Sequence, residues 1–175
     1  MNRMQLEHII RAAATIADDD QIVIVGSQSV LGQFPDAPAD LLASMEANVY
    51  PLRYPERADL IDGSIGEGSP FHETFGYYAQ GVGPETAVLP PDWQVRAILI
   101  CNPATRGATG IALEIHDLLV AKAIAGREKD REFVTAVFRH HLARPETVVE
   151  RLLLAALSPE KRAAAQGLLR VAAGR

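Results

Sequence analysis

The chain has 175 residues, of which 48% are hydrophobic, a length and composition typical of one globular domain with a substantial core. Seventeen Lys and Arg against 22 Asp and Glu give a formal net charge of −5, which argues against general attraction to nucleic acid or to an anionic membrane. The single cysteine, Cys101, excludes an intrachain disulfide, and its apolar neighbours predict a buried free thiol.

Membrane and export signals are lacking in the sequence. No apolar segment approaches the roughly 20 residues of a membrane span, and the N-terminal MNRMQLEHII has no uninterrupted apolar core of a signal peptide. We therefore expect a cytoplasmic protein without a membrane partner.

The first third of the chain predicts helix and strand in alternation. Apolar residues at helical spacing predict an opening helix that ends at Asp18-Asp-Asp20. The β-branched run 21–25 predicts a strand buried on both faces of a sheet, followed by a tight turn at Gly26 and a short helix over 29–34. A second strand is expected over 46–50.

The middle third differs in composition. Residues 51–91 are rich in Gly, Pro and aromatic residues, which predicts an ordered excursion, dominated by turns, that packs over the sheet. A third strand is expected over 95–101 and a fourth over 111–115, with a hairpin-like connection at 106–110.

The last third predicts helices. Two are expected over 117–125 and 128–141, with a break or kink at Gly126, and two more begin at Pro145 and at Ser158. Together the elements predict an α/β or α+β fold, a short mixed sheet flanked by helices with a helical C-terminal part.

The run VVERLLLAAL, residues 148–157, is more apolar than one helix stripe requires. We expect it to pack in a helical subdomain or against a second copy of the chain.

Two neighbouring strand ends carry candidate binding chemistry. A strand that delivers Gly26-Ser27 to a helix start leaves backbone N–H groups free to hold a phosphate, although a plain tight turn with a helix cap has the same pattern. Glu46 and Asn48 lie two apart on a strand and project from one face, where they could bind a hard cation such as Mg²⁺. Only Glu46 of the two carries a charge.

The helical part supplies candidate charged residues. Lys122 lies among apolar residues, so its ammonium group needs a partner, whereas Arg127 and Asp130 could simply pair on a solvated helix face. On a continuous helix Lys122 and Arg127 would lie about 140° apart, and a break at Gly126 would let them converge.

Gly26-Ser27 followed by the acidic strand SMEANVYP, residues 44–51, resembles the minimal nucleotidyltransferase domains of the DNA polymerase β superfamily. The chain is most similar to a bacterial branch related to the toxins of type IV toxin–antitoxin and abortive-infection systems. The likeness extends through GYYAQGV at 76–82, LPPDW at 89–93 and 117–130, and covers most of residues 20–135. It implies a nucleotidyltransferase-like domain over 1–141. The helical tail after about residue 142 is not covered by the likeness, and we expect it to form an extension over 142–175 packed on that domain.

The resemblance also implies roles for individual residues. The residues expected to bind the nucleotide and its phosphates are Gly26, Ser27, Lys122 and Arg127. Metal binding is expected at Glu46 and Asn48, and the expected catalytic residues are Glu46, Lys122 and Asp130. Asp117 is expected to line or support the pocket. Asn48 stands where the family has a second acid, and Asp62, Glu67 or Glu114 could supply the missing charge.

Two hypotheses follow. In the first, the chain is an Mg²⁺-dependent nucleotidyltransferase that moves a nucleotide from an NTP to a protein or RNA acceptor. In the second, it is a catalytically weakened or inactive binding or regulatory module of the same fold, in a toxin–antitoxin pair or a homo-oligomer. Asn48 separates the two in the sequence, because loss of one carboxylate weakens metal binding.

Overall fold

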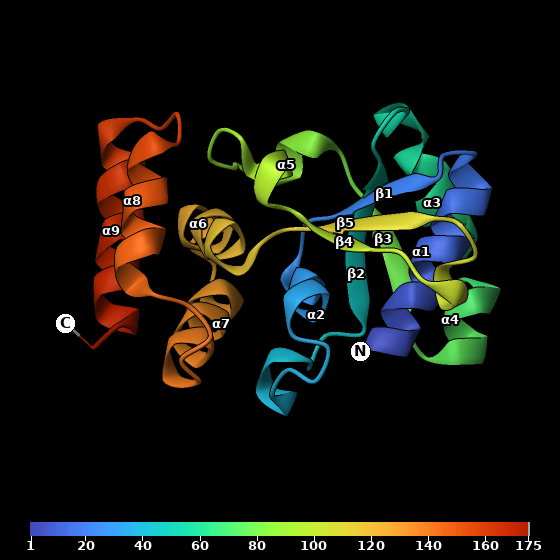
Figure 1. Cartoon of the computed structure of the whole chain (residues 1–175), viewed down its shortest axis with the longest axis horizontal. Helices are drawn as coiled ribbons and strands as arrows, with labels where there is room; N and C mark the ends of the chain where they lie inside the picture. Colours follow the sequence, from blue (N-terminus) through green and yellow to red (C-terminus); the bar gives the residue numbers. More distant parts are fainter. Residues whose placement is uncertain (175) are drawn as a thin grey trace.

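The computed structural model describes residues 1–174 (Figure 1). The strands are β1 (Gln21–Ile24), β2 (Glu46–Pro51), β3 (Tyr78–Gly81), β4 (Ile98–Ile100) and β5 (Thr109–Ala112). The α-helices are α1 (Arg3–Ala17), α2 (Val30–Gln33), α3 (Ala58–Ile65), α4 (Pro70–Phe75), α5 (Trp93–Arg96), α6 (Ile115–Ala125), α7 (Glu128–Arg139), α8 (Pro145–Leu154) and α9 (Pro159–Ala172).

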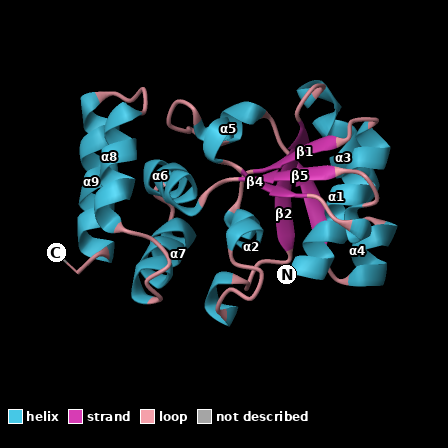
Figure 2. Ribbon diagram, in the orientation of Figure 1, coloured by secondary structure: helices cyan, strands magenta, loops and turns pink. Residues whose placement is uncertain are grey.

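The strands form one mixed sheet in the order β3-β2-β1-β5-β4. Strand β1 is antiparallel to β2 and parallel to β5, while β2 runs parallel to β3 and β4 antiparallel to β5. Figure 2 shows this sheet among the helices. The expected fold class, a short mixed sheet flanked by helices, is confirmed. Among residues 1–174 no helix has the length and apolar character needed to cross a membrane.

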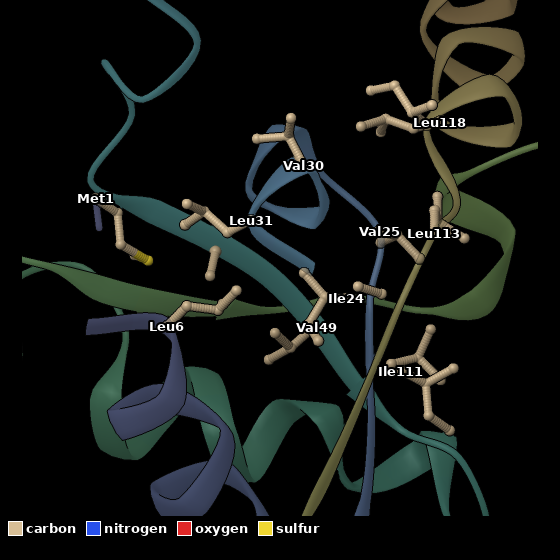
Figure 3. Close-up of a cluster of buried hydrophobic side chains, with 14 of the residues drawn as sticks. Met1, Leu6, Ile24, Val25, Val30, Leu31, Val49, Ile111, Leu113 and Leu118 are labelled. Carbon is tan, nitrogen blue, oxygen red and sulfur yellow. The ribbon is translucent and has the colours of Figure 1, made fainter. Parts of the chain in front are cut away.

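The core lies where α1 packs on the sheet. Leu6 of α1 and Leu31 of α2 are fully buried beside Ile24 and Val49, as Figure 3 shows. Side chains alternate between the faces of a strand, so burial of Ala47 and Val49 leaves Glu46 and Asn48 on the opposite, less buried face of β2. This alternation gives the sheet one apolar face and one polar strip.

Helices α6, α7, α8 and α9 form a group at the end of the molecule opposite to α1, α3 and α4 (Figure 1). Val148, Leu152 and Ala155 are buried within the chain, while Leu153 and Leu154 are exposed. The apolar run 148–157 therefore packs in a helical subdomain, one of the two expected outcomes. Helices α8 and α9, which lie in the extension predicted over 142–175, pack on α6, and α9 also packs on α7.

Several expectations from the sequence are wrong. The third strand does not extend over 95–101, because Trp93–Arg96 form α5 and β4 begins only at Ile98. Residues 51–91 are not dominated by turns, because they form α3, α4 and β3, and Gly76 ends α4 in the left-handed conformation that glycine adopts readily. Cys101 is exposed rather than buried, since it follows the short edge strand β4, whose Leu99 is itself 66% exposed.

Close packing of β3 on α3 gives a prediction for two glycines. A Cβ at Gly81 would lie 1.9 Å from the Ala58 carbonyl oxygen, a backbone atom that cannot move aside alone. Gly81→Ala should therefore lower the free energy of unfolding by about 2–3 kcal/mol. Gly63 in α3 has nothing within 4 Å of its added Cβ, so Gly63→Ala should raise that free energy by about 0.5–1 kcal/mol. Urea titrations of both variants measure the difference, and equal stabilities would contradict it.

Candidate functional site

A cleft of about 1010 Å³ separates the polar strip of the sheet from α6 and α7. It is lined from the end of β1, from β2 and β3, from the loop before β2, and from the two helices. The structure brings together in this lining six residues singled out in the sequence: Gly26, Ser27, Glu46, Asn48, Lys122 and Arg127. Their proximity is a property of the fold, since they come from three separate segments of the chain: the turn after β1, strand β2 and the α6–α7 junction.

The turn after β1 forms one wall. It continues into a three-residue 3-10 helix, Ser27–Ser29, anchored from behind by a hydrogen bond from Ser29 Oγ to the Ile24 carbonyl oxygen at 2.5 Å. The buried Gln28 donates from Nε2 to the Ser44 carbonyl oxygen at 3.2 Å. Because this helix and α2 are so short, they supply little helix dipole for an anion. Any phosphate bound here would depend mainly on cationic side chains.

The polar strip of the sheet is a hydrogen-bonded row. Asn48 Nδ2 donates to Glu46 Oε1 at 2.7 Å and to Gln80 Oε1 at 2.9 Å. The Tyr78 hydroxyl donates to Glu46 Oε2 at 3.3 Å. Asn48 and Gln80 are register partners on the parallel strands β2 and β3, which places their amides side by side. The row fixes the direction of the Asn48 amide, because its two N–H bonds each have an acceptor.

The opposite wall carries two cations tied to one buried carboxylate. Lys122 Nζ donates to Asp130 Oδ1 at 2.8 Å, and Arg127 Nε donates to Asp130 Oδ2 at 2.6 Å. Gly126 makes this possible, since it ends α6 with φ +64° and turns the chain into α7. The break predicted at Gly126 is confirmed, and it lets Lys122 and Arg127 converge. Asp130 is completely buried and lies outside the cleft lining, so it positions the cations and does not face a ligand.

The charged groups of Lys122, Arg127 and Asp130 shift one another's pKa values. Burial lowers the pKa of the Lys122 ammonium, an effect that the Asp130 carboxylate partly offsets. Burial alone would raise the pKa of Asp130, but hydrogen bonds from Arg127 and Lys122 outweigh it and hold that pKa below its ordinary value. The hydrogen bond to Asp130 raises the pKa of Arg127, and the negative charge of Glu46 across the cleft adds to the shift. Arg127 therefore stays charged, and it lines the same cleft as Glu46.

The charge of the lining differs in sign from that of the whole chain. Its cationic residues are Lys122, Arg127, Lys129, Arg131 and Arg139, and its acidic residues are Asp40, Glu46 and Glu132. The Asp130 carboxylate beneath them offsets part of this excess. A protein with a formal charge of −5 thus presents a locally positive wall, which favours an anionic ligand.

Other acids singled out in the sequence lie elsewhere. Asp117 is fully buried and accepts hydrogen bonds from Arg96 Nε at 2.8 Å, with Arg151 Nη1 at 3.0 Å, so it joins α5, α6 and α8. Glu114 is not a strand residue: it caps α6 through the His116 N–H and pairs with Arg151. Asp117 therefore does not line the pocket, and of its two expected roles only support from behind the lining is left. The expectation that Glu114 supplies charge to the pocket is wrong. Asp62 and Glu67 also lie outside the lining.

The residues present were tested against the Mg²⁺ site expected at Glu46 and Asn48. Among residues 1–174 no group of three or more His, Cys, Asp and Glu side chains is placed to hold a metal ion. The Asn48 carbonyl oxygen, its one atom able to ligate a cation, lies against Gly26, while its amide N–H bonds point at Glu46 and Gln80. This arrangement does not fit a divalent cation held between Glu46 and Asn48.

Two cleft residues, Gln80 and Arg139, were not predicted as site residues from the sequence. Gln80 lies on β3, a strand hidden in the Gly-rich and aromatic segment, although the alternation of Tyr78, Ala79 and Gln80 was a signal for it. Arg139 pairs with Asp40 between α7 and the loop before β2, a contact across 99 residues that no local pattern predicts.

A double-variant cycle tests the contact between Gly26 and Asn48. The Gly26 backbone is extended, so alanine fits its conformation, but the new Cβ would lie 2.4 Å from Asn48 Oδ1. Gly26→Ala should cost about 1–2 kcal/mol of unfolding free energy, because Asn48 must leave its hydrogen bonds. Adding Asn48→Ala removes the obstructing atoms, so the double variant should lose less stability than the sum of the single ones. Strict additivity in urea titrations would contradict this geometry.

A second hollow of about 520 Å³ adjoins the cleft at Ala87, which lines both. It is bounded by Tyr50, by the proline-rich segment 84–92 and by the start of α5 at Trp93. Burial raises the pKa of Tyr50 to about 12, so its phenol stays neutral. Without a charged side chain other than Asp92, this hollow offers nothing to attract an anion.

The chain was also compared with known proteins. Comparisons with protein families, with curated proteins and with solved structures find no match.

Proposed function

We propose that the chain is a nucleotide-binding protein whose cleft holds the phosphates of an NTP. The observation that carries the proposal is the convergence of Gly26, Ser27, Lys122 and Arg127 on one cleft with a locally positive wall. Its volume of about 1010 Å³ is at the upper limit of the range for sites that bury a small-molecule ligand.

The two walls of the cleft bind different parts of the ligand. The cationic wall attracts the phosphates, with Asp130 holding Lys122 and Arg127 in place before the ligand arrives, so less side-chain freedom is lost on binding. In the hydrogen-bonded row, the Glu46 carboxylate and the Gln80 amide are available to the rest of the ligand, while Asn48 is engaged within the row. This division supports binding of a molecule with a charged end and a polar, uncharged end, as in a nucleotide.

Calorimetric titration with ATP, GTP, CTP and UTP tests the proposal. We expect heat and a single site with at least one of the four. The same titration of Arg127→Ala should show weaker binding. No heat with any of them, with or without Mg²⁺, would overturn the proposal.

A second candidate is transfer of a nucleotide from the NTP to a protein or RNA acceptor, the reaction that the resemblance implies, although Glu46 and Asn48 do not fit the Mg²⁺ ion that the resemblance implies with it. Glu46 favours it, since a carboxylate on the wall facing Arg127 could take a proton from an acceptor hydroxyl. In that reaction the hydroxyl oxygen bonds the α-phosphorus and pyrophosphate leaves. Incubation of the protein and of RNA with NTPs labelled at the α-phosphate tests it. Label in protein or RNA that disappears with Glu46→Gln supports transfer, and binding without label supports a binding module.

A further inference from the structure

We propose that the cleft binds its nucleotide as the metal-free anion, with the phosphates in direct contact with Lys122 and Arg127. This inference rests on the proposed nucleotide binding and deepens it. It assigns the row of Glu46, Asn48 and Gln80 to hydrogen bonding with the protein and the ligand instead of metal coordination.

The direction of the Asn48 amide is the first argument. Its Nδ2 is held by two acceptors on neighbouring strands, and its Oδ1 fills the space beside the Gly26 backbone. To ligate a cation together with Glu46, the amide would have to turn over, losing both hydrogen bonds and setting its N–H groups against Gly26. A metal site would therefore have to be built by breaking an existing network.

The charges around Glu46 are the second argument. In a two-carboxylate site the metal offsets the repulsion between the acids, but here Glu46 is the one acid of the row. It already receives hydrogen bonds from Asn48 and Tyr78 and faces the charge of Arg127. The negative charge of Glu46 is thus already compensated by protein groups, without a metal ion.

The free cationic capacity of the opposite wall is the third argument. Asp130 engages Nε and Nη2 of Arg127, while the side chain remains 60% exposed in the cleft lining. Lys129 adds a further exposed ammonium group to the same lining. A free triphosphate carries more negative charge than its Mg²⁺ complex, so this wall attracts the metal-free species more strongly.

Paired titrations at matched ionic strength test the inference. The protein is titrated with the NTP that binds best, once in EDTA and once in Mg²⁺. We expect the dissociation constant in EDTA to be equal to or lower than that in Mg²⁺. A lower dissociation constant in Mg²⁺ would overturn metal-free binding and leave nucleotide binding intact, whereas no heat in either buffer would overturn both.

Two variants of the row sharpen the test. Glu46→Gln keeps the shape and the acceptor for Asn48 but removes a negative charge near the phosphates, so binding in EDTA should tighten several-fold. Weaker binding in EDTA by a Glu46→Gln variant that melts at the same temperature as the wild type would contradict the inference.

Asn48→Asp places a second carboxylate beside Glu46, so it should weaken binding in EDTA and create a dependence on Mg²⁺ that the wild type lacks. Unchanged binding of Asn48→Asp in both buffers would also contradict it.

Discussion

Asp130→Ala is expected to lower the free energy of unfolding by about 3 kcal/mol or more, the range seen when one partner of a buried ion pair is removed. The Asp130 side chain is completely buried, and it is the hydrogen-bonded partner of Lys122, whose own side chain is only 11% exposed. Alanine would leave that ammonium group without its counter-charge. Urea denaturation measures the loss.

Glu128→Ala is the matched control for Asp130→Ala. Glu128 lies in the same first turn of α7 but is exposed, so its removal should cost only a few tenths of a kcal/mol. Similar losses for the two variants would show that Asp130 acts through the helix dipole and not through the buried pair.

The pH dependence gives a second readout of the same carboxylate. The pKa of Asp130 is lower in the folded protein than its ordinary value, because Arg127 and Lys122 favour the charged form despite burial. Its contribution to stability is therefore complete above the unfolded-state pKa of about 3.9 and is lost as the pH falls through the lower folded-state value. The stability gap between wild type and Asp130→Asn should narrow in that acidic range, and a gap independent of pH would contradict the assignment.

Arg127→Ala is expected to weaken nucleotide binding by about 10- to 100-fold, the effect of losing a hydrogen bond between charged groups. Stability should change little, because the Arg127 side chain is 60% exposed and its ion pair with Asp130 is only one of two. Lys122→Ala would change affinity and stability together, since it also removes a buried partner of Asp130. Calorimetry for affinity and thermal melting for stability separate the two effects.

Arg170→Ala in α9 controls for the change in net charge. This residue is exposed and lies outside the cleft lining, so its removal should leave affinity unchanged within error. An equal loss of affinity for Arg127→Ala and Arg170→Ala would mean that the cleft does not bind the nucleotide.

The fold was readable from the sequence where local patterns were strong. The apolar run before Gly26 predicted β1, Glu46 began a strand as expected, and Ser158 caps α9 by accepting a hydrogen bond from the Lys161 N–H. Residues 51–91 were misjudged because their many Gly and Pro residues interrupt elements of only four to eight residues, which tertiary packing stabilises and local propensity does not.

The site was predictable as a set of residues but not as an arrangement. The apolar surroundings of Lys122 correctly indicated a need for a partner, and the break at Gly126 allowed Asp130 to be that partner. The direction of the Asn48 amide could not be read from the sequence, because it depends on Gln80 in a neighbouring strand and on the missing side chain of Gly26. That direction is what argues for hydrogen bonding in place of metal coordination.

Mapping the bound nucleotide by NMR tests the central claim most directly, because it asks where the ligand lies. Backbone amide shifts of the isotope-labelled protein are followed as the best-binding NTP is added. The account predicts the largest changes at Gly26, Ser27 and the α6–α7 junction around Arg127, with little change around Trp93 in the second hollow. Changes centred on Trp93, or none near Gly26 and Arg127 at saturation, would contradict it.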